Sequence, residues 1–517
     1  MLGVASHFLR YVHALVAGIL PVLLVGLALA AFTWNRDAVF FGGNVYFTDG
    51  DCYARMTRVR ILQENPLAPV RHHDFENFPE GTSPHTTAPL DYLIAGVAAV
   101  LKPFAGNPLA DAGAWISPVL GLATLCVLVF WGRSFAYGNA PLLLLAVSPI
   151  VSHGFLLGRP DHQSLLMFLM TISLVAEVGI WKGKSWGMLS AAAWALGLWV
   201  SLFEPLILVV AVLAARLASG RLRVSRNPIA LFAGILLIAL VTDGFRVEAF
   251  DTHFSRWALN IGELRHGSPA VLFSWAGWLV IPAPLILGWR FFRSREPICL
   301  LFACLLVPLI GLSLFHLRWG YFLALVFAMS LPWVLPAFRW RAAGWGIFVL
   351  SLWPVAAAWE QTLYPDDEGF RARAESVADE VALRDAAVRL RDLPRHGVIA
   401  PWWFSPAIVW WSGQPCVAGT SHQSLPGIAD TAEFFLSEGT GRKILERREA
   451  GYIFSYEPDR VAANSAQILG RGVPSNPLAR RLHDQPHSAE FPLLYANRFF
   501  KVFQAPVPAV PASEPGG

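Results

Sequence analysis

Long apolar segments recur through the first 360 residues, and each is close to the length that a helix needs to cross a bilayer. A hydrocarbon core of about 30 Å takes roughly 20 apolar residues. The pattern predicts spans at 13–33, 115–132, 139–157, 164–181, 186–203, 205–219, 229–243, 269–289, 297–315, 319–337 and 343–360. We therefore expect a polytopic α-helical membrane protein with about 11–13 transmembrane helices.

Residues 87–103 are apolar enough to span but are interrupted by Pro89 and Asp91. Short loops rich in Lys and Arg stay cytoplasmic. The basic loops contain Arg133, Lys182, Lys184, Arg221, Arg223, Arg226, Arg290, Arg293, Arg295, Arg339 and Arg341. All of them share the side of Arg10 if 87–103 lies along the outer surface without crossing. We therefore predict a juxtamembrane external helix there, and the segments rich in carboxylates then face outward.

The pattern changes after Glu360 to a mixed polar sequence. We predict three parts. Residues 1–360 form a membrane domain with an external loop over 34–114, residues 361–504 form a soluble extracytoplasmic α/β domain, and 505–517 form a disordered tail. In the soluble part, 371–393 has helical periodicity, whereas 398–401 and 452–456 are typical of short buried strands.

Composition supports a membrane-embedded body. Of 517 residues, 55% are hydrophobic and 15% charged, against about 25% charged in soluble domains. The mean hydropathy is +0.48. A net charge of +4 is too small to indicate a nucleic-acid partner. Five cysteines are too few for a disulfide framework.

Carboxylates at the predicted membrane rim are the first candidates for chemistry. Asp49 and Asp51 follow the first span, and Asp161 precedes an apolar run with His162 and Gln163 beside it. Carboxylate oxygens are hard ligands that suit Mg²⁺ or Mn²⁺. Both Asp49 and Asp161 also suit the N-cap of a helix, which is the structural alternative.

Three further positions are candidates with structural alternatives of their own. Glu263, in the external loop 244–268, is either a base, an acceptor-orienting carboxylate or an ion-pair partner of Arg265. Arg318 opens a span beside aromatic residues, where arginine either snorkels or binds phosphate. The pair Trp402 and Trp403 is more often core than a binding wall.

These segments, taken in order, resemble the catalytic subunit of oligosaccharyltransferases, a family with the GT-C membrane fold that transfers a lipid-linked glycan to asparagine. The motifs that carry the resemblance are Asp49–Arg58, Phe78–His85 with Pro89-Leu90-Asp91, Gly158–Gln163, Ile261-Gly262-Glu263 and Arg318–Phe322. No single motif is specific, but five motifs in the family's order are considerably stronger. The resemblance covers residues 1 to about 420.

The resemblance implies a role for each candidate. Asp49 matches the catalytic Asp, Asp161 the metal-binding Asp, and Glu263 the residue that engages the acceptor amide. Arg318 matches the arginine that contacts the donor pyrophosphate, and Trp402 with Trp403 the acceptor-binding motif. A divalent ion, Mg²⁺ or Mn²⁺, is implied, with Asp49, Asp161 and Gln163 as ligands and Asp51, His162 or His85 as further candidates.

Two departures from the family bear on these roles. Phe404 stands where the family's Trp-Trp-Asp motif has its Asp, and a phenyl ring cannot accept the hydrogen bond from the hydroxyl of an Asn-x-Ser/Thr acceptor. A charge-assisted bond of this kind is worth about 1.5–3 kcal/mol. Gln163 stands where relatives carry Glu or His, and it is a weaker ligand.

Three functions remain open from the sequence. The first is inverting transfer of a glycan from a polyprenyl phosphate or pyrophosphate to an extracytoplasmic protein or glycan acceptor at the plasma (inner) membrane. The second is a GT-C enzyme that moves a single sugar onto lipid, protein or envelope polysaccharide. The third is a non-enzymatic transporter or scaffold, which the clustering of ionisable residues at the rim disfavours.

Overall fold

The computed structural model describes residues 18–84, 88–221, 225–244, 252–487 and 491–506. The chain folds into two compact units. Unit 1 comprises residues 1–45, 86–244 and 262–366, and unit 2 comprises 46–85, 245–261 and 367–517. Two segments that lie between helices of unit 1 in the sequence, 46–85 and 245–261, therefore belong with the C-terminal segment.

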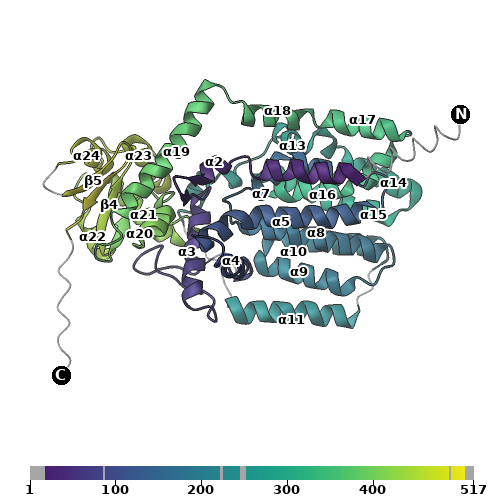
Figure 1. The fold of residues 1–517 in the computed structure, drawn as a ribbon, viewed down its shortest axis with the longest axis horizontal. Coiled ribbons are helices and arrows are strands. Elements are labelled where there is room, and N and C mark those ends of the chain that lie inside the picture. The colour runs from purple at the N-terminus through teal and green to yellow at the C-terminus, as the bar shows by residue number, and fades with distance from the viewer. Residues whose placement is uncertain (1–17, 85–87, 222–224, 245–251, 488–490, 507–517) are drawn as a thin grey trace. The chain divides into compact units, whose positions relative to one another are not determined.

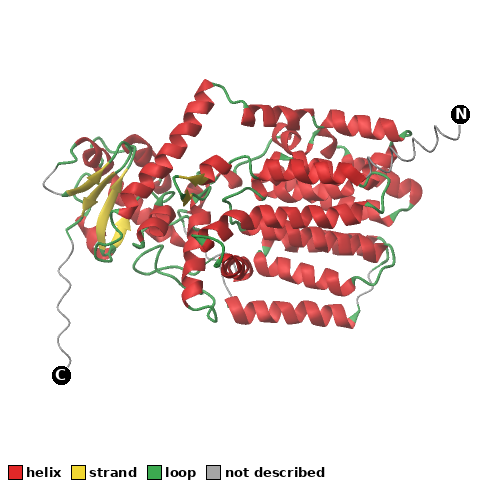
Figure 2. Ribbon diagram, in the orientation of Figure 1, coloured by secondary structure: helices red, strands yellow, loops and turns green. Residues whose placement is uncertain are grey.

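Unit 1 is a bundle of helices that lie side by side (Figures 1 and 2). Its elements are α2 (Arg36–Val39), α4 (Ala88–Leu101), α5 (Pro108–Gly132), α6 (Ala140–Val147), α7 (Pro149–Gly154), α8 (His162–Trp181), α9 (Gly187–Val200), α10 (Phe203–Ala218), α11 (Arg226–Asp243), α13 (Pro269–Ala276), α14 (Ala283–Ser294), α15 (Pro297–Phe315), α16 (Gly320–Val334), α17 (Arg341–Ser351) and α18 (Trp353–Leu363). A short hairpin pairs β1 (Phe40–Phe41) with β2 (Asn44–Val45).

Seven helices among the described residues are long and apolar enough to cross a membrane. They coincide with the predicted spans at 13–33, 115–132, 164–181, 229–243, 297–315, 319–337 and 343–360, although residues 13–17 lie outside the described part. The other four predicted spans fall on shorter helices. The segment 139–157, for example, divides into α6 and α7 at Pro149, because proline has no N–H to continue the helical ladder.

The ambiguous segment 87–103 forms α4, a 14-residue helix that is shorter than a span. The Asp243 carboxylate, at the end of α11, accepts a hydrogen bond from the Ala88 backbone N–H at 3.4 Å. The same carboxylate accepts a hydrogen bond from the Trp199 indole. Asp243 thus satisfies an N–H that the first turn of α4 leaves without a helical partner.

Unit 2 is a small α/β unit whose sheet has the order β3-β4-β6-β5 (Figure 2). The strands are β3 (Gly397–Ile399), β4 (Ala450–Ser455), β5 (Leu493–Ala496) and β6 (Lys501–Gln504), and only β3 and β4 are parallel. The helices are α3 (Gly50–Glu64), α12 (Phe254–Ala258), α19 (Asp367–Val388), α20 (Ser405–Ser412), α21 (Leu425–Leu436), α22 (Arg442–Arg447), α23 (Pro458–Leu469) and α24 (Leu478–Asp484). The predicted small sheet-containing part at the C-terminus is confirmed, and residues 46–85 and 245–261 also belong to this unit.

The loop segment 252–261 contributes to the core of unit 2. Trp257, from α12, is 5% exposed and packs in one cluster with Leu425 and Ile428 of α21 and with Ile468 of α23. Fully burying a large apolar side chain of this kind contributes about 1.5–3 kcal/mol. Phe254 and Ile261 pack against the same cluster, so the loop is anchored onto the C-terminal segment.

Candidate active site

The loop before α8 in unit 1 presents a group of polar side chains. Gly158 has φ +76°, a conformation that glycine adopts without strain. Its N–H donates to the Ala114 carbonyl of α5 at 2.9 Å, and the Ser117 hydroxyl donates to the carbonyl of Arg159. Helix α5 therefore fixes the backbone of this loop, and with it the direction of the side chains that follow.

The Arg159 guanidinium lies at the centre of this group and is only 4% exposed. Its Nη1 donates to Gln163 Oε1 at 3.0 Å. Its Nη2 lies 2.9 Å from Glu263 Oε1 and 3.0 Å from Asp161 Oδ2. Two carboxylates and one amide oxygen therefore converge on a single buried cation. We call Arg159, Asp161, Gln163, Glu263 and Tyr321 the Arg159 cluster.

Glu263 lies in a single 3₁₀ turn, Gly262–Leu264, and hydrogen-bond donors surround its carboxylate. Oε1 accepts from Arg159, from the Tyr321 hydroxyl at 3.1 Å and from Gln163 Nε2 at 3.3 Å. Oε2 accepts from Gln163 Nε2 at 3.1 Å. The Glu263 side chain is therefore held in place by three neighbouring side chains, each of which donates to its carboxylate.

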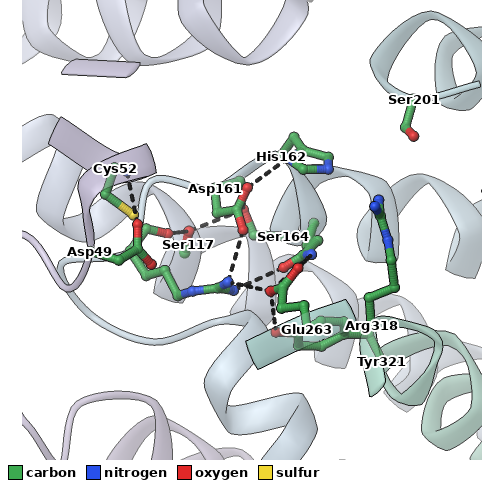
Figure 3. Close-up of polar contacts among 12 residues, drawn as sticks. Asp49, Cys52, Ser117, Asp161, His162, Ser164, Ser201, Glu263, Arg318 and Tyr321 are labelled. Carbon is green, nitrogen blue, oxygen red and sulfur yellow. Dashed lines mark hydrogen bonds and ion pairs between the residues drawn. The ribbon is translucent and has the colours of Figure 1, made fainter. Parts of the chain in front are cut away.

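Tyr321 links this carboxylate to α7. Its hydroxyl lies 2.8 Å from His153 Nδ1, and it has a single proton to donate. When that proton points to Glu263, His153 donates from Nδ1 to the hydroxyl oxygen. Figure 3 shows Tyr321 beside Glu263, with the hydrogen bond between them dashed.

Asp161 precedes α8 at the N-cap position, but its side chain makes no capping hydrogen bond. Its carboxylate instead contacts Arg159 through Oδ2 and His162 Nδ1 through Oδ1, at 2.6 Å (Figure 3). Asp161 is 12% exposed. The helix-capping alternative for Asp161 therefore does not describe its side chain.

Arg318 lies in the 3₁₀ turn Leu317–Trp319, just before α16. It forms an ion pair with Glu204, in the first turn of α10. Glu204 is 2% exposed, and Ser201 also donates to it. Arg318 is 29% exposed, so a buried carboxylate holds a guanidinium that remains accessible.

In unit 2, Asp49 is the N-cap of α3, where its Oδ1 accepts from the Cys52 N–H at 2.9 Å. The capping alternative for Asp49 is therefore realised. Asp51 lies in the first turn of the helix and is exposed. A Cβ at Gly50 would lie 2.6 Å from Thr420 Cγ2 and 3.3 Å from the Trp403 carbonyl, so glycine allows the close approach that positions this turn.

The aromatic residues at 402–404 have different surroundings. The Trp402 indole donates to Asn464 Oδ1 at 3.0 Å, and its ring packs edge-on against Trp257. Trp403 lies under the Arg460 guanidinium, 5.4 Å from ring centroid to Cζ. Phe404 packs against Tyr456 and Phe500, at centroid distances of 4.9 and 5.3 Å. An aromatic cluster thus occupies the position where the family motif has a carboxylate.

The sequence candidates are brought together only in part. Asp161, His162, Gln163 and Glu263 meet within unit 1, and Arg318 pairs with Glu204 in the same unit. Asp49, Asp51, Trp402 and Trp403 belong to unit 2. His85 lies outside the described residues. Sequence reasoning assigned no role to Arg159, Tyr321 or Glu204. Arg159 stands two residues before Asp161, and Tyr321 stands three residues after Arg318. This closeness in sequence to the candidate residues was the signal that could have indicated them.

The donors of unit 1 fit a divalent cation in kind but not in number. Within the described ranges, no group of three or more His, Cys, Asp or Glu side chains is arranged to hold a metal ion. Mg²⁺ is usually bound through one or two carboxylates, with water and substrate phosphate completing the shell. The Asp161 carboxylate fits such a partial site.

No family model matches the chain. The curated dolichyl-phosphooligosaccharide-protein glycotransferase 1 of Archaeoglobus fulgidus is 25% identical over 169 residues, which cover 32% of this chain and 28% of that protein. The match thus spans less than a third of the curated relative. These figures support a resemblance over a limited region.

Solved structures match over most of the chain. The Archaeoglobus fulgidus oligosaccharyltransferase in complex with Zn and sulfate has a TM-score of 0.66 and 14% identity, over 92% of this chain and 78% of that one. ArnT from Cupriavidus metallidurans bound to undecaprenyl phosphate has a TM-score of 0.55 and 13% identity, over 93% and 97%. The GT-C fold and the resemblance to oligosaccharyltransferases are confirmed.

Proposed function

We propose that the protein is a membrane glycosyltransferase that moves a glycan from a polyprenyl phosphate or pyrophosphate to an acceptor outside the membrane. The observation that carries the proposal is the Arg159 cluster, in which Arg159, Gln163 and Tyr321 donate to the Glu263 carboxylate and fix its position. A carboxylate whose position is fixed in this way can orient a nucleophile by accepting its hydrogen bond. The partial sequence match and the two structural neighbours support this class of reaction.

Arg318 is the proposed contact for the donor phosphate. A guanidinium matches phosphate geometry through paired N–H donors, and the buried Glu204 restricts its orientation. When the acceptor attacks the anomeric carbon, the bond from that carbon to the phosphate oxygen breaks and the lipid phosphate leaves with the electron pair. The proton of the attacking N–H or O–H is released to solvent by way of the Glu263 carboxylate that accepts its hydrogen bond. Arg318 would stabilise the negative charge that develops there, and a single displacement inverts the anomeric carbon.

Asp161 is the proposed ligand of a divalent cation, Mg²⁺ or Mn²⁺. Such an ion supplies a Lewis acid that neutralises phosphate charge. The Zn bound in the archaeal neighbour supports a metal in this fold without fixing its identity. His162, which contacts Asp161 through Nδ1, would orient the carboxylate.

The charges of the loops support the proposed orientation. Arg133, Lys182, Lys184 and Arg221 lie between predicted spans, where the positive-inside rule sets them in the cytoplasm. The Arg159 cluster would then face outward across the plasma (inner) membrane. The donor would enter from the bilayer, and the acceptor from the external side.

A second function is favoured by one observation. The Phe404 ring packs against Tyr456 and Phe500 and offers no acceptor for a Ser or Thr hydroxyl. A GT-C enzyme that transfers sugar to lipid, protein or envelope polysaccharide without a sequon would need no carboxylate at this position. Mass spectrometry of a deletion strain separates the two functions. Loss of Asn-linked glycan supports the first, whereas altered lipid or polysaccharide with intact glycoproteins supports the second.

Transfer from a radiolabelled polyprenyl-linked glycan in membranes tests the proposal directly. Asp161→Asn and Glu263→Gln should each lower transfer by about 100-fold or more. Asp111→Asn changes a carboxylate of unit 1 outside the Arg159 cluster and should leave transfer unchanged. EDTA should abolish transfer reversibly if the cation is required. Full activity of both cluster variants would refute the proposal, and full activity in EDTA would remove the metal from it.

A further inference from the structure

Gln163 stands at a position where the sequence resemblance implies a metal ligand, but its contacts in unit 1 are of another kind. The side chain is 2% exposed and lies in the first turn of α8. Its Oε1 accepts from Arg159 Nη1 at 3.0 Å. Its Nε2 donates to both oxygens of Glu263, at 3.3 and 3.1 Å. The amide therefore bridges a cation on one side and an anion on the other.

The neighbours of Gln163 determine which way its amide points. If the amide were turned over, its NH₂ group would face the Arg159 guanidinium and its oxygen would face the Glu263 carboxylate. Both contacts would be repulsive, because arginine has only donors and an ionised carboxylate only acceptors. The observed orientation is therefore required by the charges on either side.

We infer that Gln163 is a positioning residue for Glu263 and not a ligand of a metal ion. Gln163 Oε1 already accepts from the Arg159 guanidinium, which would repel a metal cation bound there. The Asp161 carboxylate also contacts Arg159, but its negative charge offsets such repulsion, whereas the neutral amide of Gln163 has no charge to do so. A carboxylate at position 163 would face Glu263 across about 3 Å, and the two negative charges would repel as well. An amide is the side chain that satisfies both neighbours, because it accepts from Arg159 and donates to Glu263.

The inference rests on the proposed function in one respect, because Glu263 is the residue that would orient the acceptor. Gln163 would act through the Glu263 carboxylate, whose position it fixes together with Arg159 and Tyr321. Loss of the bridge should therefore weaken acceptor binding more than donor binding. It should leave the affinity for a divalent cation nearly unchanged.

Gln163→Glu distinguishes the two roles, since a carboxylate is a better metal ligand than an amide and a worse neighbour for Glu263. For the positioning role we expect a rise of about tenfold or more in the KM for the acceptor. The Mn²⁺ affinity, measured by electron paramagnetic resonance on the purified full chain, should stay within about threefold of wild type. A metal ligand would give tighter Mn²⁺ binding and retained transfer.

Gln163→Met keeps the length of the side chain without its polar atoms, so it covers the case in which Gln163→Glu does not fold. It should raise the acceptor KM and leave Mn²⁺ binding unchanged, whereas a metal ligand would lose Mn²⁺ affinity. Gln467→Glu, at an exposed position of α23, controls for the added charge.

The exchange variant Gln163→Glu/Glu263→Gln restores one amide and one carboxylate around Arg159. It should restore most of the melting temperature that Gln163→Glu loses, because the effects of two substitutions at residues in contact do not simply add. It should not recover transfer, since the carboxylate has moved. Absence of transfer in the wild type would refute the proposed function alone, because Mn²⁺ binding and the exchange variant still report on Gln163. Tighter Mn²⁺ binding by Gln163→Glu, or no recovery in the exchange variant, would overturn the inference.

Discussion

A buried acid in unit 2 makes the stability of this protein depend on pH. Glu76 is 2% exposed, its Oε2 accepts from the Ser424 hydroxyl at 3.2 Å, and its Oε1 has no hydrogen-bond partner among the residues that the structure describes. A Cβ at Gly419 would lie 2.5 Å from Glu76 Cδ, so the backbone closes tightly over the carboxyl group. Burial raises the pKa of Glu76 from 4.5 to about 7.

The size of the effect on the free energy of unfolding follows from the change in the pKa of Glu76. The difference between 7 and 4.5 is 2.5 pKa units, and at about 1.4 kcal/mol per unit this is about 3 kcal/mol. The folded chain favours the protonated acid, so its stabilising effect is complete below pH 4.5. The effect is lost progressively as the pH rises through 7. The folded protein should therefore be less stable at pH 8 than at pH 5 on account of this group.

Glu76→Gln removes the charge and keeps the shape. Its free energy of unfolding should exceed that of the wild type by up to about 3 kcal/mol above pH 8 and equal it near pH 4. Denaturation of the full chain in detergent, followed by tryptophan fluorescence between pH 4 and 9, measures both. Glu433→Gln, at a carboxylate that is 49% exposed and pairs with Arg471, is the matched control. Parallel pH profiles for Glu76→Gln and the wild type would refute the reasoning.

Other perturbations test the remaining parts of the structure. Arg318→Met should raise the KM for the lipid donor by about 10- to 100-fold, because a charge-assisted hydrogen bond is worth about 1.5–3 kcal/mol; an unchanged donor titration would exclude the phosphate contact. Phe404→Asp should destabilise unit 2 by about 3 kcal/mol or more in denaturant titrations, since it places a charge against Tyr456, whereas Phe404→Leu should cost about half as much. Gly50→Ala should cost about 1–3 kcal/mol by crowding, and Thr420→Ser, which removes the Cγ2 in question, should restore most of that loss in a melting experiment.

Local pattern in the sequence was sufficient for the secondary structure and the fold class. The seven long apolar helices coincide with predicted spans, because the bilayer sets a minimum length that composition alone reveals. Asp49 could be proposed as a cap of α3 for a similar reason, since a helix start is a local feature. The strands β3 and β4 follow from short apolar runs in the sequence. Every residue of both strands is buried.

The tertiary structure decided which polar groups meet. Arg159 and Glu263 are 104 residues apart in sequence and 2.9 Å apart in the fold, and Glu204 reaches Arg318 from another helix. No periodicity or spacing encodes such a pair, because its geometry depends on how the helices of the bundle pack. The order of the motifs could suggest that Gln163 binds a metal. Only the packed structure places that amide between a cation and an anion, where each of its atoms has the partner that its charge requires.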